Sequence, residues 1–291
     1  MSAAASGAAA VRRTRIRAGG TQPRVLEAGP ADAREAVVFV HGNPGSCDDW
    51  ERLAGALGAS GVRTVAVDLP DFGETIAPDG FVHDVPTYAT FLEEALGVLG
   101  VECVHLVIHD FGGPIGLVWA AMHTERVGSV TLMDTGILPG YRWHRLARIW
   151  RTPLLGELFQ VISTPRVLRR MLPREEPSGL PDWFLDRIHY SRRTRRAVLA
   201  LYRATDDPGA AATEFAAFMA SKDIPALVIW GEHDAYLPSS YAARQRDAFP
   251  SAEVHVLPAS GHWPYADAPE TVERLLIEFT QRVQSTSAAA A

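Results

Sequence analysis

The chain has 291 residues, of which 47% are hydrophobic, and a formal net charge of −6. This length suits one large hydrophobic core, and the acidic balance argues against a nucleic-acid partner, which would require a basic surface. No apolar stretch reaches the roughly 20 residues that a membrane-spanning helix needs.

The two ends of the chain are rich in alanine and serine, and we expect residues 1–10 and 285–291 to be disordered tails. A secretory signal has basic residues before its apolar segment, whereas here the arginines at positions 12, 13 and 15 come after the alanines. Cys47 and Cys103 are the only cysteines, too few for a disulfide framework. These features together predict a cytoplasmic protein.

Short apolar runs rich in valine and isoleucine recur along the chain and predict buried parallel strands. They cover 37–40, 64–67, 104–108, 130–133, 227–230 and 254–257. Two earlier runs, Thr14–Arg17 and Arg24–Glu27, predict an antiparallel hairpin at the sheet edge.

Amphipathic stretches separate these runs and predict helices over 50–57, 88–99, 114–123 and 271–283. The alternation of strand and helix is typical of an α/β fold with a mostly parallel, doubly wound sheet. We assign residues 11–139 and 223–284 to this core.

The alternation breaks once, because residues 140–222 offer helical patterns with no strand between them. We interpret this segment as an inserted helical cap. Its residues 141–203 hold 14 arginines against five acids, a net charge of +9, which leaves −15 for the rest of the chain. Arg142, Arg145, Arg148 and Arg151 recur every three residues, as on one side of a helix. A solvated face or salt bridges to the core would explain this charge, as would attraction of an anionic substrate or surface.

The central motif is His109-Asp110-Phe111-Gly112-Gly113, at the point where a predicted strand ends and a helix begins. An exposed nucleophile on a sharp strand-to-helix turn is typical of α/β-hydrolases, and the glycines would permit the turn. Asp110 stands at the nucleophile position, where the helix N-terminus would favour an ionised carboxylate. The alternative is an ordinary helix cap.

Three more polar motifs follow predicted strands. Asn43 lies in a His-Gly-Asn-Pro-Gly loop, where a backbone N–H could help to bind an oxyanion. Asp234 and His262 follow the last two strands, which gives the chain order nucleophile, acid, histidine. Asp134, directly after the strand at 130–133, is an alternative acid.

These motifs resemble the branch of the α/β-hydrolases that contains epoxide hydrolases and haloalkane dehalogenases, over residues 12–283. The resemblance implies that Asp110 attacks carbon to form an alkyl ester, which water activated by His262 then hydrolyses. Asp234 would orient His262, and the N–H groups of Asn43 and Phe111 would hold the oxyanion. It implies a small hydrophobic organic substrate, water as the second reactant and no cofactor or metal.

The sequence is compatible with two leaving groups, a halide and an epoxide oxygen. A halide would need N–H donors; Asn43 fits, Phe111 has no donor, and the tryptophans at 143, 150 and 183 could substitute. An epoxide needs a tyrosine of the cap, for which Tyr202 is the best match and Tyr141 and Tyr190 are looser ones. We therefore favour an epoxide hydrolase, with a haloalkane dehalogenase as the alternative. A non-catalytic binding homologue and another ester hydrolase also remain open.

Overall fold

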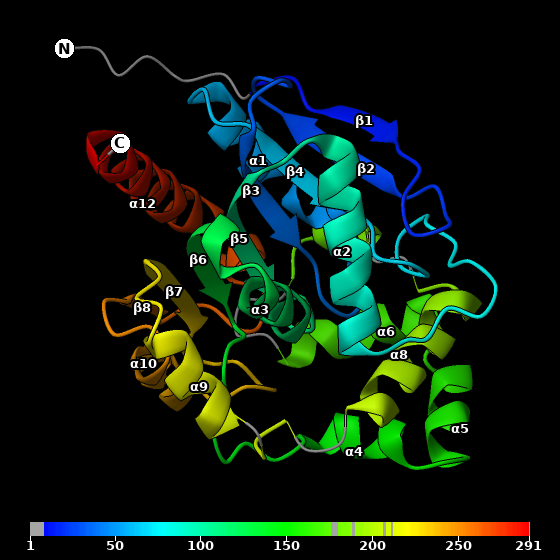
Figure 1. Ribbon diagram of the computed structural model, residues 1–291. Helices are drawn as coiled ribbons and strands as arrows, with labels where there is room; N and C mark the ends of the chain where they lie inside the picture. The colour runs from blue at the N-terminus through cyan, green and yellow to red at the C-terminus, as the bar shows by residue number, and fades with distance from the viewer. Residues whose placement is uncertain (1–8, 176–179, 188–189, 206–207, 211, 291) are drawn as a thin grey trace.

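The computed structural model describes residues 9–175, 180–187, 190–205, 208–210 and 212–290. Its central feature is an eight-stranded sheet with the order β1-β2-β4-β3-β5-β6-β7-β8 (Figure 1). The strands are β1 (Arg12–Arg15), β2 (Arg24–Ala28), β3 (Glu35–Val40), β4 (Thr64–Val67), β5 (Cys103–His109), β6 (Val127–Met133), β7 (Ala226–Gly231) and β8 (Glu253–Leu257).

Strands β3 to β8 pair in parallel, whereas β1 and β2 form an antiparallel hairpin and β2 runs antiparallel to β4. The predicted fold class is confirmed. Strands β4 and β7 are buried along their whole length, as expected for strands covered on both faces. The hairpin begins two residues earlier than predicted, at Arg12.

Helices cover both faces of the sheet. On one face lie α1 (Glu51–Ala59), α11 (Pro264–Asp267) and α12 (Pro269–Ala290); on the other lie α2 (Val85–Leu99), α3 (Gly112–Met122) and α10 (Ser240–Arg244). Each face has its own hydrophobic cluster, one built around Trp50 and Phe39, the other around Trp119 and Tyr88. These clusters hold the strand ends, and the loops that follow them, in a fixed arrangement.

The segment between β6 and β7 is helical and lies beyond the carboxyl ends of the strands (Figure 1). It contains α4 (Arg145–Arg151), α5 (Leu155–Ile162), α6 (Pro165–Glu175), α7 (Asp182–Arg187), α8 (Arg192–Ala204) and α9 (Ala212–Ala220). We call this segment the insertion. Arg142 precedes α4, so only Arg145, Arg148 and Arg151 of the predicted arginine row lie on one helix.

The predicted tails differ from the structure at both ends. Residues 1–8 lie outside the described part, but the N–H of Ala9 donates to the carbonyl of Gly55, 3.0 Å away. Residues 285–290 continue α12 instead of forming a disordered tail. Alanine, the strongest helix former, dominates this stretch and extends the helix. Among the described helices none combines the length and the apolarity that crossing a bilayer requires.

Candidate active site

Asp110 lies on a strained turn between β5 and α3. Its φ is +47°, a left-handed backbone conformation that residues other than glycine rarely adopt. A Cβ on Gly112 would lie 2.2 Å from the carbonyl oxygen of Val40, and one on Gly113 would lie 1.8 Å from Thr135 Oγ1. Both glycines are therefore required by close packing, and they lift Asp110 out of the sheet.

The two carboxylate oxygens of Asp110 have different surroundings. Oδ1 accepts a hydrogen bond of 2.7 Å from the backbone N–H of Asn43, and the N–H of Phe111 also donates to the carboxylate. Oδ2 lies 3.4 Å from His262 Nε2. Burial opposes ionisation, but the hydrogen bond and the charge of His262 outweigh it and lower the pKa of Asp110 to about 2. The carboxylate is therefore ionised at neutral pH.

His262 lies between Asp110 and Asp234. Its Nδ1 is 2.8 Å from Asp234 Oδ2, while Asp234 Oδ1 accepts from the backbone N–H groups of Tyr236 and Leu237. Burial works against a charged imidazole, but the carboxylates of Asp234 and Asp110 raise the pKa of His262 well above its usual value. The imidazolium is thus the favoured form while Asp110 is ionised.

His109, for which the sequence predicted no separate role, binds the backbone of the loop that carries His262. The Nε2 of His109 lies 2.7 Å from the carbonyl oxygen of His262 and donates to it. Burial, together with the charge of His262, lowers the pKa of His109 to about 3, so its ring is neutral. The position of His109 next to Asp110 in the sequence could have indicated that it belongs to the site.

Asp134 lies behind Asp234. It is fully buried, and its Oδ1 accepts from the N–H of Gly231 at 2.9 Å. Carboxylate oxygens of Asp134 and Asp234 and a ring nitrogen of His262 lie within 4.8 Å of one another. Burial and the charge of Asp234 raise the pKa of Asp134 well above its ordinary value, which favours the neutral acid.

Tyr202, on α8, brings a phenol from the insertion to this site. The residue is 3% exposed, and the side chain of Asn43 acts on its pKa against the effect of burial. Burial and the charge of Asp110 raise its pKa well above the usual value, so the phenol keeps its proton. The Phe111 ring packs edge-on against Tyr202, with centroids 4.7 Å apart, and offers no hydrogen bond.

Two cavities meet at Asp110. The larger, of about 300 Å³, is lined mainly by apolar side chains such as Leu117, Val118 and Phe215. The smaller, of about 50 Å³, extends under the insertion. Asp110, His144, Tyr202 and Tyr236 line both cavities.

His144 and Tyr236 were not among the predicted site residues. His144 caps α4, where its Nδ1 accepts from the N–H of Ala147, and burial lowers its pKa to about 4. The neutral ring therefore carries its proton on Nε2. A capping role depends on where α4 begins, which the arginine-rich sequence did not reveal. Tyr236 stands two residues after Asp234, which was a usable signal.

The other candidate donors of the insertion are divided between the cavities. Trp143 and Tyr141 line the larger cavity, and Trp150 and Tyr190 line the smaller one. The hydroxyl of Tyr190 donates to Gln160 Oε1, whereas Trp150 Nε1 is buried without a hydrogen-bond partner among the described residues. The side chain of Trp183 lies outside the described part of the structure.

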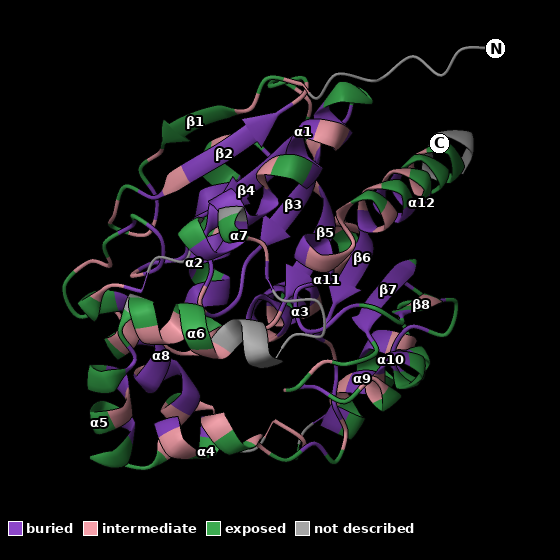
Figure 2. Ribbon diagram, turned by 180° about the vertical axis from the view of Figure 1, so that it is seen from behind, coloured by how far each residue is buried: buried purple, intermediate pink, exposed green. Residues whose placement is uncertain are grey.

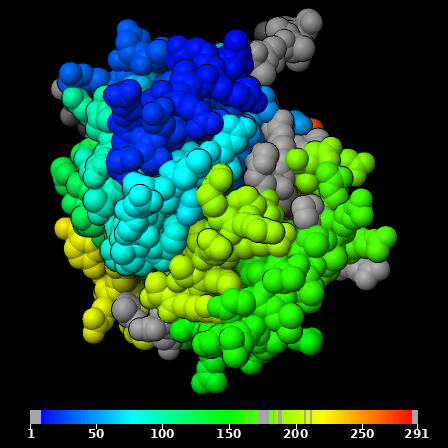
Figure 3. All heavy atoms as spheres, turned by 90° about the vertical axis from the view of Figure 1, so that its right-hand side faces the viewer, coloured from blue at the N-terminus to red at the C-terminus, as the bar shows by residue number. Residues whose placement is uncertain are grey.

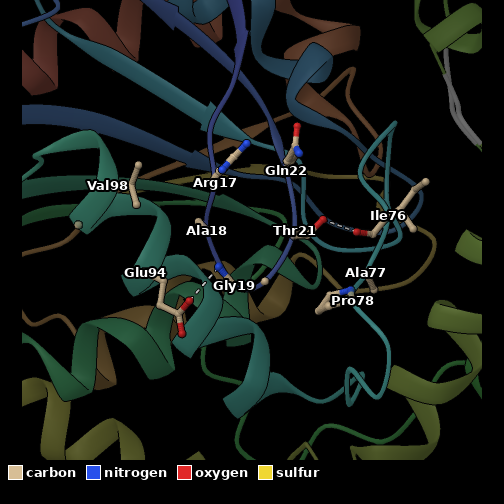
Figure 4. Close-up of a pocket in the computed structure, with 12 residues that line it drawn as sticks. Arg17, Ala18, Gly19, Thr21, Gln22, Ile76, Ala77, Pro78, Glu94 and Val98 are labelled. Atoms are coloured by element: carbon tan, nitrogen blue, oxygen red, sulfur yellow. Dashed lines mark hydrogen bonds between the residues drawn. The ribbon is translucent and has the colours of Figure 1, made fainter.

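A larger hollow, of about 940 Å³, lies at the surface between the β1–β2 hairpin and α2 (Figure 4). It is lined by the 17–22 loop, Ile76–Pro78 and Glu94, whose carboxylate accepts from the N–H of Gly19. None of the residues that bind Asp110 or His262 lines it. Size alone therefore does not locate the chemistry of this protein.

Among the described residues, two groups of side chains have the spacing of a metal site. One is Asp134, Asp234 and His262, in which the short contact between His262 Nδ1 and Asp234 already uses two ligand atoms. The other is Glu35, Cys103 and His105, and there both ring nitrogens of His105 are hydrogen-bonded, to Ser129 and Glu35. Neither group therefore offers a free set of ligands.

Comparison with known proteins gives a consistent family. The family described as the alpha/beta hydrolase fold matches residues 35–269. A 2-hydroxy-6-oxononadienedioate/2-hydroxy-6-oxononatrienedioate hydrolase of Paraburkholderia phymatum is 27% identical over 94% of this chain and 96% of its own length. Haloalkane dehalogenase 2 of Mycobacterium bovis is also 27% identical, over 83% of this chain and 86% of its own length.

The fold has close matches among solved structures. The haloalkane dehalogenase structure from Bradyrhizobium elkani superimposes with a TM-score of 0.82 at 24% identity, covering 95% of this chain and all of that one. The chain therefore belongs to the α/β-hydrolase fold family and is a hydrolase.

Proposed function

We propose that this protein hydrolyses a small hydrophobic epoxide through a covalent ester on Asp110. In the first step Asp110 Oδ2 forms a bond to an epoxide carbon while the ring C–O bond breaks. The released oxygen takes the proton of Tyr202, and solvent later restores that proton. The apolar lining of the 300 Å³ cavity supports a hydrophobic substrate.

The second step returns the free carboxylate. Neutral His262 removes a proton from water, and the water oxygen attacks the ester carbonyl. The acyl C–O bond then breaks, and the leaving oxygen takes the proton back from His262 as the diol departs. The new carboxylic acid of Asp110 loses its proton to His262, which restores the carboxylate and the imidazolium. The N–H groups of Asn43 and Phe111, which bind the carboxylate in the resting protein, would hold the oxyanion.

The change in charge at Asp110 explains how one histidine can serve both states. While Asp110 is ionised, its charge helps to keep His262 protonated. Ester formation removes that charge, so the pKa of His262 falls and the ring can act as a base. Alkylation thus prepares the base that the next step needs.

Asp234 is the acid partner that the geometry supports, since its Oδ2 contacts His262 at 2.8 Å. We assign Asp134 a different role. As a neutral acid it can donate its proton to the Asp234 carboxylate and hold it in place, because two ionised carboxylates could not share this buried site.

The observation that carries the epoxide assignment is the position of Tyr202. It lines both cavities together with Asp110, and its raised pKa keeps the phenol protonated. A phenol in this state can protonate an opening epoxide.

One observation favours haloalkane dehalogenation as a second candidate. Trp150 lines the smaller cavity together with Asn43 and Asp110, and its indole N–H has no partner among the described residues. An indole N–H and an amide could hold a halide. The dehalogenase relatives and structural neighbours agree with this chemistry.

Mass spectrometry of the intact His262→Gln variant would test the proposal. This variant cannot activate water, so the ester should accumulate. An epoxide adds its whole mass to the protein, whereas a haloalkane adds its mass less that of the hydrogen halide. The double variant Asp110→Asn/His262→Gln is the control and should show no adduct.

Three results are possible. A whole-epoxide adduct supports epoxide hydrolysis, and an alkyl adduct from haloalkanes alone transfers the assignment to dehalogenation. A folded His262→Gln protein without any adduct from either library contradicts covalent catalysis at Asp110 and leaves ester hydrolysis or simple binding.

A further inference from the structure

The outer face of the insertion carries an unusual row of exposed apolar side chains. Eleven large hydrophobic residues of the described chain are exposed, and five of them lie within nine consecutive positions on and beside α5. They are Leu154 (83% exposed), Leu155 (46%), Leu158 (60%), Val161 (69%) and Ile162 (55%). We call these five residues the α5 ridge. Figure 2 shows α5 largely in the colour of exposed residues, at the edge of the molecule.

The opposite side of α5 fixes the direction in which the ridge points. A Cβ on Gly156 would lie 2.5 Å from the carbonyl oxygen of Trp150, so α5 packs tightly against α4 there. Gln160, which is buried, accepts a hydrogen bond of 2.6 Å from Tyr190. The helix therefore cannot turn to bury the ridge without breaking these contacts.

The helices that flank α5 carry exposed positive charge. The helices next to α5 in the chain and in space bear six exposed arginines that form no ion pair with any described residue: Arg145 and Arg148 on α4, Arg166 and Arg170 on α6, and Arg192 and Arg196 on α8. By contrast, Arg169 and Arg203 of the insertion pair with acids of the insertion itself, and among the described ion pairs Arg193 alone joins the insertion to an acid of the core, Asp71. The salt bridges that could have explained the arginine excess thus account for only part of it.

The inner sides of α4, α5 and α6 cover the candidate active site. Trp150 of α4, Phe159 of α5, and Leu168 and Met171 of α6 line the smaller cavity, which also contains Asp110. In Figure 3, which faces this side, the insertion forms the lower part of the surface. A surface that covers the α5 ridge would therefore lie a single helix layer away from the cavity.

We propose that the α5 ridge docks onto an anionic lipid bilayer, with the exposed arginines of the flanking helices α4, α6 and α8 on the headgroups. An apolar helix face bordered by basic residues is the arrangement that binds at the bilayer interface without crossing it. A lipid surface adapts to a convex ridge, whereas a protein partner would have to supply a matching groove. Docking would place the cavity beside the phase into which a hydrophobic substrate partitions.

A second copy of this chain is a poorer occupant of the ridge. A symmetric dimer would bring the same patch of each protomer together and would oppose two sets of arginines that have no ion-pair partner among the described residues. Anionic lipid removes this repulsion. The docking proposal does not depend on which bond the active site cleaves.

Vesicle co-sedimentation of the full chain tests the proposal. We expect binding to phosphatidylcholine vesicles that contain about 30% phosphatidylglycerol, little binding to phosphatidylcholine alone, and release by roughly 0.5 M salt. The Arg145→Gln/Arg148→Gln variant should lose roughly 30-fold in partition coefficient, since each basic residue near such a surface contributes about fivefold. Arg12→Gln/Arg17→Gln, which removes the same charge from exposed positions on and just after β1, is the control and should bind within about twofold of the wild type.

A second pair of variants tests the ridge itself. Leu158→Asp should abolish vesicle binding, and Val98→Asp on α2, where the side chain is 56% exposed, should not. Circular dichroism would confirm that both variants remain folded. The proposal is overturned if the wild type does not bind anionic vesicles, or if both members of a pair behave alike. A dimer that Leu158→Asp dissociates, without any vesicle binding, would identify a second copy as the occupant instead.

Discussion

The two sides of the active site are built differently. On the sheet side, Asp110, Asp234 and His262 lie in the loops that follow parallel strands, and backbone N–H groups bind both carboxylates. On the insertion side, Tyr202 and Trp150 come from helices α8 and α4, and the indole N–H of Trp150 has no acceptor among the described residues. The difference implies that the sheet side determines the kind of reaction, while the insertion determines which leaving group and substrate it serves.

The largest expected effect is on the sheet side. Asp110→Asn keeps the shape of the side chain but removes the nucleophile, and we expect turnover to fall about 10⁴-fold or more. Steady-state kinetics on the substrate class named by the adduct experiment would measure it. If the variant kept a tenth of the activity with an unchanged melting temperature, the sheet side would not supply the nucleophile.

The paired acids should differ strongly in effect. Asp234→Asn removes the charge that stabilises His262 and should cost on the order of 10³-fold to 10⁴-fold in kcat. Asp134→Asn can still accept from Gly231 and donate to Asp234, so its cost should stay under about tenfold. The reverse ranking would make Asp134 the acid partner of His262.

Changes on the insertion side should alter selectivity. Tyr202→Phe removes the proposed proton donor and should lower kcat on epoxides by about 10²-fold, with less than about twofold change on haloalkanes. Trp150→Phe is the matched variant for the halide alternative and should show the opposite preference. Equal losses on both substrate classes would indicate that these side chains act only through packing.

The pH dependence should separate the two chemical steps. Asp110, with a pKa of about 2, stays ionised at every usable pH, and Tyr202 stays protonated. Ester formation should therefore change little between about pH 5 and 8, whereas ester hydrolysis needs neutral His262 and should slow as the pH falls. Rapid-quench mass spectrometry of the wild type should show more ester at pH 5 than at pH 8. Less ester at pH 5 would contradict the role of His262 as the base.

The smallest expected effect is on stability. Because the pKa of Asp134 is raised in the folded protein, its contribution to stability is complete below about pH 4 and declines as the pH rises toward the folded value. Asp134→Asn has no such decline. We therefore compare the melting temperature of the variant with that of the wild type at each pH. The difference, variant minus wild type, should be about 2–5 °C more positive at pH 8 than at pH 4. A constant difference across this range would mean that Asp134 is ionised in the folded state.

Much of the sheet side was predictable because it depends on local sequence. Strands buried on both faces appear as continuous apolar runs, and the site residues follow them directly, so position along the chain predicted Asp110, Asp234 and His262 as neighbours. Gly112 and Gly113 marked the turn for a steric reason that the structure confirms. Helix ends were less predictable, as the extension of α12 to Ala290 illustrates.

The amino-acid sequence by itself determined the α/β fold, the strand ends and the order of the polar loops, since these follow from hydrophobic periodicity and from the needs of tight turns. Only the tertiary structure decided which of two aspartates contacts His262, that Tyr202 faces Asp110, and that the α5 ridge stays uncovered. Each of these depends on distances of a few ångströms between segments far apart in the chain. Such distances follow from the packing of whole layers, which no local pattern encodes.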